Sequence, residues 1–279
     1  GIVDYIEMDD NITILSIRLP DAWIGKSLID LNVRQKYHIT VVAIKRKNKM
    51  KLEVKNIKVE TTEGKEILNN FSLIINSGET HVIMGPNGVG KSTLSKVIMG
   101  HPDYLVTEGD ILFNGTSIID LSVDERAKLG IFLTMQAPIS IEGVSNSEFL
   151  RTAVNSKTDE KINLYSFIKE LDSAVNDLKM EKDMIHRSIN KDFSGGERKK
   201  NEILQMKVLK PKFLMFDELD SGLDVDSLRI VCENINNYIS SNKETSVLII
   251  THYPKILEYI KPTYVHIIKN GSIVKTGDY

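Results

Sequence analysis

The chain has 279 residues, of which 41% are hydrophobic and 27% are charged, with 36 Lys and Arg against 38 Asp and Glu. This composition is typical of globular proteins and excludes collagen-like and disordered chains. A net charge of −2 argues against a surface that binds nucleic acid, and the single cysteine, Cys232, excludes an internal disulfide framework. No run reaches the roughly 20 apolar residues of a membrane span, and the N-terminus lacks a signal-peptide pattern. We therefore expect a cytoplasmic protein with no membrane insertion of its own.

The first part of the chain, residues 1–49, is short for a domain with its own core. Apolar residues between Ile12 and Ile17 indicate an extended segment, and residues 39–44 (ITVVAI) have the pattern of a buried strand. A basic, polar run at residues 45–51 separates this part from the rest. The pattern predicts a domain boundary near residue 50.

From residue 50 to residue 279, apolar strands alternate with helical segments. In chain order we predict a strand at 80–84, a helix at 91–99, a strand at 213–216, a helix at 225–238, a strand at 247–250, a helix at 255–260 and two strands around 270. Strands that are almost entirely apolar are typical of a sheet covered on both faces, so we predict an α/β fold. Residues 121–190 have helical patterning without comparable strands and predict a helical subdomain.

A glycine-rich turn joins the strand at 80–84 to the helix at 91–99. It matches the pattern G-x-x-x-x-G-K-[ST] with Gly85, Pro86, Asn87, Gly88, Val89, Gly90, Lys91 and Ser92. Glycines allow successive backbone N–H groups to point at phosphate oxygens, and the N-terminus of the following helix adds a favourable dipole. We expect Lys91 to reach the β- and γ-phosphates and the Ser92 hydroxyl to bind Mg²⁺. The motif predicts nucleotide binding.

Two carboxylates follow the apolar strand at 213–216. A buried strand brings Asp217 to the carboxyl edge of the sheet, near the metal that Ser92 would hold. Glu218 beside it can orient or deprotonate an attacking water. An apolar run that ends in Asp-Glu is a weak signal alone, but with the glycine turn in the same sheet it favours a hydrolytic site.

Three further motifs stand in the second half of the chain. Residues 194–197 (SGGE) precede a helical stretch, where N–H groups and a hydroxyl suit phosphate oxygens. Residues 221–224 (SGLD) follow the carboxylate pair, and His252 follows the strand at 247–250, from which it can reach the γ-phosphate. Each motif is weak alone, because Ser-Gly-Gly is usually a loop and a lone histidine is more often structural.

Taken in order, these motifs resemble those of the ATP-binding-cassette (ABC) ATPase family over nearly all of residues 50–278. The resemblance implies ATP as substrate, Mg²⁺ as cofactor, and a core sheet with a helical subdomain. It also implies that two cassettes pair head to tail, so that Ser194 and Gly196 of one act at the ATP site of the other. The positions implied for binding and hydrolysis are Lys91, Ser92 and Thr93 in the Walker A loop, Gln136 in the Q-loop as a hydrolytic residue and Mg²⁺ ligand, Ser194, Gly195, Gly196 and Glu197 in the signature motif, Asp217 and Glu218 in Walker B, Asp224 in the D-loop, and the switch histidine His252.

Within this family the chain resembles the soluble SufC-type ATPases of iron–sulfur cluster assembly. The signature continues as SGGERKKNEILQM at 194–206, and Walker B continues as DELDSGLD at 217–224. Transport cassettes instead have Ser-Gly-Gly-Gln before an Arg- and Ala-rich helix, and Asp-Glu-Pro at Walker B. The resemblance implies a SufB–SufD-type scaffold as partner, engaged through the helical subdomain near Gln136. Residues 59–64 lack the aromatic side chain on which many cassettes stack adenine, so adenine selectivity follows from the family alone.

Residues 1–49 resemble part of the TrkA-C type regulatory domain of potassium-uptake regulators, on the basis of WIGKSL at 23–28 and VVAIKR at 41–46. Two interpretations stay open: an unnatural junction that joins a fragment to an essentially complete ATPase, or a genuine appended domain. We assign no activity to this part. For the whole chain, two alternatives also stay open: the nucleotide-binding subunit of a membrane transporter, and a non-enzymatic potassium-transport regulator.

Overall fold

A computed structural model describes residues 2–9, 12–17, 23, 27, 29–41, 50–157 and 162–278. The chain divides into two compact units, Gly1–Lys47 and Asn48–Tyr279. In the first unit, β1 (Ile2–Asp9) and β2 (Ile12–Ile17) form an antiparallel hairpin, and α1 (Val33–Tyr37) is a short helix. The rings of Trp23 and Tyr37 lie 5.2 Å apart.

The strand expected at 39–44 is not found at residues 39–41, where the backbone is irregular and Ile39 is exposed. The rest of that expected strand lies outside the described residues, as do most positions of the TrkA-C resemblance. An apolar run forms a strand only beside a hydrogen-bonding neighbour, and β1 and β2 pair with each other. The prediction of a strand is therefore wrong for 39–41.

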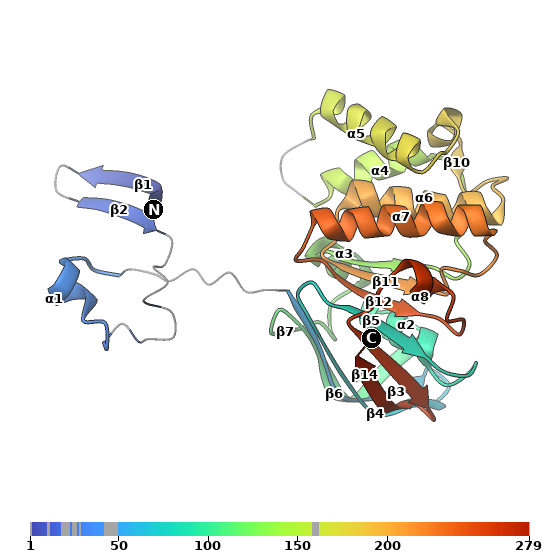
Figure 1. Ribbon diagram of the computed structural model, residues 1–279, viewed down its shortest axis with the longest axis horizontal. Coiled ribbons are helices and arrows are strands. Elements are labelled where there is room, and N and C mark those ends of the chain that lie inside the picture. The colour runs from blue at the N-terminus through green and yellow to red at the C-terminus, as the bar shows by residue number, and fades with distance from the viewer. Residues whose placement is uncertain are drawn as a thin grey trace. The chain divides into compact units, whose positions relative to one another are not determined.

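The second unit is built on a six-stranded sheet in the order β14-β13-β5-β12-β11-β8 (Figure 1). The strands from β13 to β8 are parallel to their neighbours, and β14 runs antiparallel to β13. The strand bounds are β5 Thr80–Met84, β8 Ile131–Thr134, β11 Phe213–Asp217, β12 Ser246–Ile250, β13 Tyr264–Lys269 and β14 Ser272–Asp278. The α/β sheet predicted from the sequence is confirmed.

Side chains of the central strands alternate between two hydrophobic cores. In β11, Leu214 and Phe216 face one core, and Phe213 and Met215 face the other. All four are fully buried. Because the sheet is covered on both faces, its strands have no polar side, which explains their continuous apolar pattern.

Helices cover one face of this sheet and an antiparallel sheet covers the other (Figure 1). The helical layer consists of α4 Asn146–Asn155, α5 Leu164–Asp177, α6 Gly195–Leu209, α7 Val225–Ser241 and α8 Ile256–Tyr259. The opposite layer contains α2 Lys91–Met99 and the sheet β4-β3-β6-β7, with β3 Lys51–Thr61, β4 Glu66–Asn76, β6 Tyr104–Phe113 and β7 Thr116–Ser117. None of the helices in the described parts of the chain combines the length and the apolar character that crossing a membrane requires.

The helical subdomain predicted at 121–190 contains a strand of the main sheet. Strand β8 pairs in parallel with β11, so the expectation of no comparable strand in this range is wrong for residues 131–134. The pattern of the four residues 131–134 is too short to predict a strand, and they form one because β11 lies alongside. The remaining elements are α3 Val123–Leu129, β9 Ile141–Ser145, α4, α5, the 3₁₀ helix η2 Lys182–Ile185 and β10 Ser188–Ile189.

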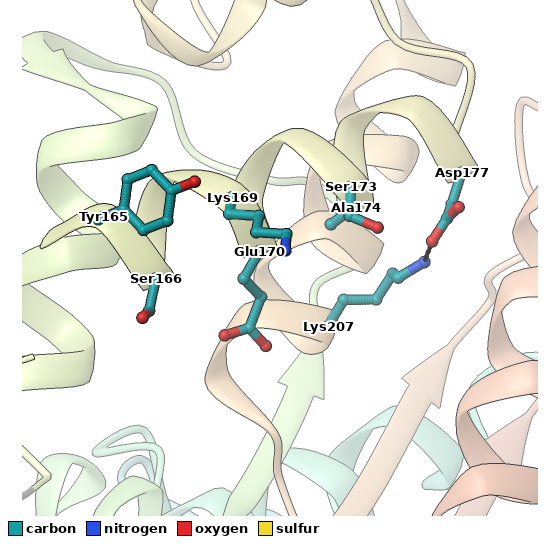
Figure 2. A pocket seen from close by; sticks show the side chains of 8 residues that line it. All are labelled: Tyr165, Ser166, Lys169, Glu170, Ser173, Ala174, Asp177 and Lys207. Carbon is teal, nitrogen blue, oxygen red and sulfur yellow. Dashed lines mark hydrogen bonds and ion pairs between the residues drawn. The ribbon is translucent and has the colours of Figure 1, made fainter. Parts of the chain in front are cut away.

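Helices α5 and α6 border a surface groove of about 520 Å³ (Figure 2). Tyr165 and Lys169 of α5 line it, and Lys207 of α6 closes one end with an ion pair to Asp177 of α5. The predicted nucleotide residues do not line this groove. These residues lie instead at the carboxyl edge of the main sheet and in the loops beside it.

Candidate active site

The glycine turn leads directly from β5 into α2. Gly90 has a φ of +101°, a left-handed conformation, and a Cβ there would lie 2.5 Å from Cδ2 of Leu68. At Gly85 a Cβ would lie 2.5 Å from the carbonyl oxygen of Ile268. Both positions therefore require glycine, for conformation or for close packing. This geometry directs the N-terminus of α2 toward the carboxyl edge of the sheet.

Lys91 and Ser92, the first two residues of α2, point to the centre of the site. The buried Lys91 ammonium donates to the carbonyl oxygens of Gly85 and Pro86 at 2.9 and 2.8 Å, so it lies across the turn. Burial lowers the Lys91 pKa, and the nearby Glu218 and Asp217 oppose this shift. Pro86, Asn87 and Gly88 are exposed, whereas Thr93 is buried, in α2.

Asp217 ends β11 and meets Ser92. The Ser92 hydroxyl donates to Oδ1 of Asp217 at 2.9 Å. Asp217 is 3% exposed, and burial raises its pKa while the hydrogen bond from Ser92 opposes the shift. A hydroxyl and a buried carboxylate are the hard oxygen ligands that Mg²⁺ prefers. In the described parts of the chain, no group of three or more His, Cys, Asp and Glu side chains is arranged to hold a metal ion.

Glu218 is bracketed by two side chains from the neighbouring strands. The Gln136 amide, which follows β8, donates to Oε2 of Glu218 at 2.6 Å. Nδ1 of His252, which follows β12, lies 3.3 Å from Oε1 of Glu218. Because β8, β11 and β12 are adjacent and parallel, their carboxyl ends bring these three residues together.

The backbone at Glu218 is strained. Its φ is +48°, a left-handed conformation that is uncommon for a residue with a long side chain. Its N–H donates to the carbonyl of Ile250 at 2.9 Å, and its carbonyl accepts from the N–H of Ser221. Such strain costs of order 1–3 kcal/mol and persists where surrounding contacts enforce it, often at functional sites. Here it turns the Glu218 carboxylate toward Gln136 and His252.

The groups that hold the residues around Gln136 and His252 come from the tertiary structure and not from a sequence motif. The buried Thr251 accepts a hydrogen bond from the N–H of Tyr253 at 2.9 Å, which shapes the turn around His252. Met135, directly before Gln136, is held by Lys199 and Glu202 of α6. A threonine after a strand and a Lys/Glu pair on a helix are common patterns, so the sequence carries no signal that singles them out.

The signature residues lie at a helix terminus beside the D-loop. Ser194 caps α6 and forms a capping box with Glu197, and Asp224 caps α7 by accepting from the N–H of Ser227 at 2.8 Å. A Cβ on Gly195 or Gly196 would contact residues 222–227. The backbone N–H of Ser194 lowers the pKa of Glu197, and the backbone N–H of Ser227 lowers the pKa of Asp224, because each stabilises the charged carboxylate. No hydrogen bond or ion pair of the described residues joins 194–197 to the glycine turn.

The described contacts thus bring five predicted side chains together beside Lys91 and the glycine turn. The hydrogen-bonded and ion-paired contacts join Ser92 to Asp217, and Gln136 and His252 to Glu218. Among the described contacts, Gln136 bonds to Glu218 and not to Ser92 or Asp217, so a role as metal ligand stays a prediction. The signature motif and Asp224 form a separate group.

Comparisons with known proteins identify the family of the chain. Residues 68–221 match the family model described as ABC transporter. The chain is 51% identical over 233 residues to the probable ATP-dependent transporter ycf16 of Cyanophora paradoxa, an alignment that covers 81% of this chain and 88% of that protein. It is 48% identical over 228 residues to vegetative protein 296 of Bacillus subtilis, which covers 81% of this chain and 86% of that protein.

Solved structures share the fold. The dimeric structure of MJ0796, a bacterial ABC transporter cassette, superposes with a TM-score of 0.71 over 81% of this chain and 98% of that chain, at 21% identity. The same cassette has been solved as a dimer in a post-hydrolysis state with ADP and Pi, also with a TM-score of 0.71. Taken with the matched family model and the relatives, these findings show that the chain belongs to the ABC transporter family and is an ATPase.

Proposed function

We propose that this ATPase hydrolyses Mg²⁺-bound ATP at the carboxyl edge of the main sheet, with residue roles that follow from its contacts. Glu218 orients and polarises the attacking water, because its carboxylate is fixed on both sides by Gln136 and His252. Lys91 neutralises charge on the phosphates. The bracketed Glu218 beside the Ser92–Asp217 pair is the observation that carries the proposal.

The residues present fit a magnesium ion. Ser92 and Asp217 would hold it, with Gln136 as a further candidate from the sequence. When bound, Mg²⁺ neutralises charge that develops on phosphate oxygens. The chain itself supplies the buried carboxylate of Asp217, the Ser92 hydroxyl that lies 2.9 Å from it, and the backbone N–H groups of the glycine turn. Catalysis of this kind depends mainly on positioning and electrostatics.

We further propose that two cassettes pair head to tail when ATP is bound. Ser194 and Gly196 would then contact the phosphates held by the partner chain. In support of this, the described contacts include no hydrogen bond or ion pair between residues 194–197 and the glycine turn, whereas a Cβ on Gly195 or Gly196 would contact residues 222–227. The N-terminus of α6 supplies the N–H groups and dipole that suit a phosphate.

The output of hydrolysis in this proposal is a conformational change in a SufB–SufD-type scaffold during iron–sulfur cluster assembly. The motif departures SGGERKKN and DELD support this branch of the family. Exposed apolar side chains near Gln136 offer a docking surface on the helical subdomain: Met135, Ile139 and Ile141 are 48%, 66% and 42% exposed. Cys232 is buried, and no cluster of metal ligands accompanies it in the described parts of the chain. The cluster chemistry would therefore belong to the partner.

A second candidate function is the nucleotide-binding subunit of a membrane transporter. The names of the relatives favour it, since they describe probable ATP-dependent transporters and ABC transporter ATP-binding proteins. Affinity purification of the tagged chain from its own cells discriminates the two. A soluble scaffold as the copurifying partner supports the first candidate, and an integral membrane permease supports the second.

The residue roles are tested by turnover of MgATP. We expect Glu218→Ala to abolish hydrolysis while ATP binding is kept, because Glu218 acts on the water and has no hydrogen bond or ion pair to the glycine turn among the described contacts. Glu233→Ala, a change of an exposed glutamate on α7, is the matched control and should hydrolyse ATP at the parental rate. If Glu218→Ala also hydrolyses ATP at that rate, the role assigned to Glu218 is wrong.

A further inference from the structure

A buried ion pair on α6 holds the backbone of Met135, the residue before Gln136. Glu202 Oε1 accepts from the N–H of Met135 at 2.6 Å, and Lys199 Nζ donates to its carbonyl oxygen at 2.7 Å. The two side chains lie 3.1 Å apart and are 6% and 4% exposed. Both backbone groups of one residue are therefore satisfied by the two members of one ion pair.

Met135 needs such partners because it leaves the sheet. The pairing of β8 with β11 ends at Thr134, opposite Phe216. Backbone groups beyond that point cannot use a neighbouring strand, and next to the buried Lys199 and Glu202 they pair with these side chains instead. The carbonyl that Lys199 holds belongs to the peptide bond that joins Met135 to Gln136. Its orientation therefore sets where the Gln136 side chain begins.

The other end of the same segment is also tied to α6. Asn190 donates from Nδ2 to the carbonyl of Ile139 at 2.9 Å, and its own carbonyl accepts from the Ser140 hydroxyl at 3.0 Å. Asn201 of α6, fully buried, donates to Oδ1 of Asn190 at 3.0 Å. Residues 135–140 are thus held at both ends by polar groups that α6 supplies directly or through Asn190.

We propose that Lys199 and Glu202 are positioning residues that set the peptide group before Gln136 and, through Gln136, the carboxylate of Glu218. This inference rests on the proposed roles of Gln136 and Glu218. A buried ion pair is by itself a weak source of stability, because the desolvation of two charges opposes their attraction. Its specific consequence here is the fixed geometry of Met135. Because Ser194 begins the same helix, a shift of α6 when cassettes pair would reach Glu218 by this route.

The test is a double-mutant cycle on the full chain with MgATP as substrate. Glu202→Ala leaves the Met135 N–H without its acceptor, and we expect kcat to fall by about 10-fold or more, in line with the effect of ~1 Å misplacements at active sites. The KM for ATP should stay within about twofold, because the glycine turn is untouched. Glu202→Gln keeps an acceptor oxygen and should restore most of the parental kcat.

The decisive measurement is Gln136→Ala with and without Glu202→Ala. If Glu202 acts through Gln136, the double variant has the same kcat as Gln136→Ala alone, whereas a general structural effect multiplies the two losses. Multiplied losses, or a parental kcat for Glu202→Ala, overturn the inference and leave the proposed function intact. A parental kcat for Gln136→Ala overturns the role of Gln136 and the inference together.

Two further variants guard against a failure to fold. Lys199→Met removes the other half of the pair and should lower kcat in the same way, and urea unfolding reports whether each variant is folded. Asp177→Asn is the matched control. It removes the charge that pairs with Lys207, which lies on α6 like Lys199 but about two turns further toward its C-terminus. That control should keep the parental kcat and KM.

Discussion

Two buried histidines give the cassette a pH-dependent stability that can be worked out from their contacts. His81 lies on β5 and His266 on β13, and they are 2% and 5% exposed. Nδ1 of His81 lies 2.9 Å from Nε2 of His266. Nε2 of His81 lies 3.0 Å from the Glu79 carboxylate, and Nδ1 of His266 lies 2.9 Å from the Thr276 hydroxyl.

These contacts assign one proton arrangement. The Glu79 carboxylate only accepts, so His81 donates from Nε2 and its Nδ1 accepts from Nε2–H of His266. The Thr276 hydroxyl then donates to Nδ1 of His266. Both rings are neutral in this chain of hydrogen bonds, and a proton added to Nδ1 of His81 would place two donors 2.9 Å apart.

The pKa shifts give the sign and size of the effect. Burial, and the neighbouring His81, lower the pKa of His266 from 6.5 to about 4, and burial also lowers the pKa of His81. At His266, the unfolded chain therefore binds a proton below pH 6.5, whereas the folded chain binds it only below about pH 4. The stability that the neutral histidines contribute is fully present above pH 6.5 and is lost as the pH falls from 6.5 toward about 4. For His266 alone the loss by pH 5 is about 2 kcal/mol.

The assay is urea unfolding at pH 7.5 and pH 5, with the free energy taken by linear extrapolation. The parental chain includes carboxyl groups that also titrate, so the informative quantity is the difference from a variant with both histidines replaced by glutamine. We expect this variant to lose at least about 2 kcal/mol less than the parental chain between the two pH values, because His81 adds to the contribution of His266. His101→Gln, at a partly exposed histidine, should lose as much as the parental chain. An equal loss in the double variant would refute the assignment of neutral, buried rings.

The remaining predictions concern the site and the division of the chain. Lys91→Ala should abolish turnover and weaken ATP binding, measured by titration with labelled MgATP, since the ammonium faces the glycine turn; unaltered binding would contradict its role. Gly90→Ala should lower the urea midpoint and ATP affinity, because its φ is +101° and a Cβ would lie 2.5 Å from Leu68. An unchanged urea midpoint and ATP affinity would contradict the tight packing of the turn. Removal of residues 1–49 should leave the ATPase rate within about twofold, because Asn48–Tyr279 is a compact unit with its own core; loss of activity would assign the first unit a function.

Much of the fold follows from local pattern. The strand at 80–84 and the helix at 91–99 were predicted with the bounds that β5 and α2 have. This worked because apolar strands covered on both faces have a continuous pattern, and because Gly90 marks the start of α2. The short β8 and the irregular backbone at 39–41 could not be predicted, since strand formation there depends on whether another strand lies alongside.

The sequence by itself determined which chemical groups are present: a glycine turn before Lys91 and Ser92, and an acidic pair at the end of an apolar strand. Only the tertiary structure decided which groups meet. Gln136 and Glu218 are 82 positions apart and bond because β8 lies next to β11. Likewise Lys199 and Glu202 look like an ordinary surface pair on a helix, and only the packing of α6 beneath Met135 buries them. Turns and strand patterns are local properties of the chain, whereas strand order and helix packing are set by contacts between distant segments.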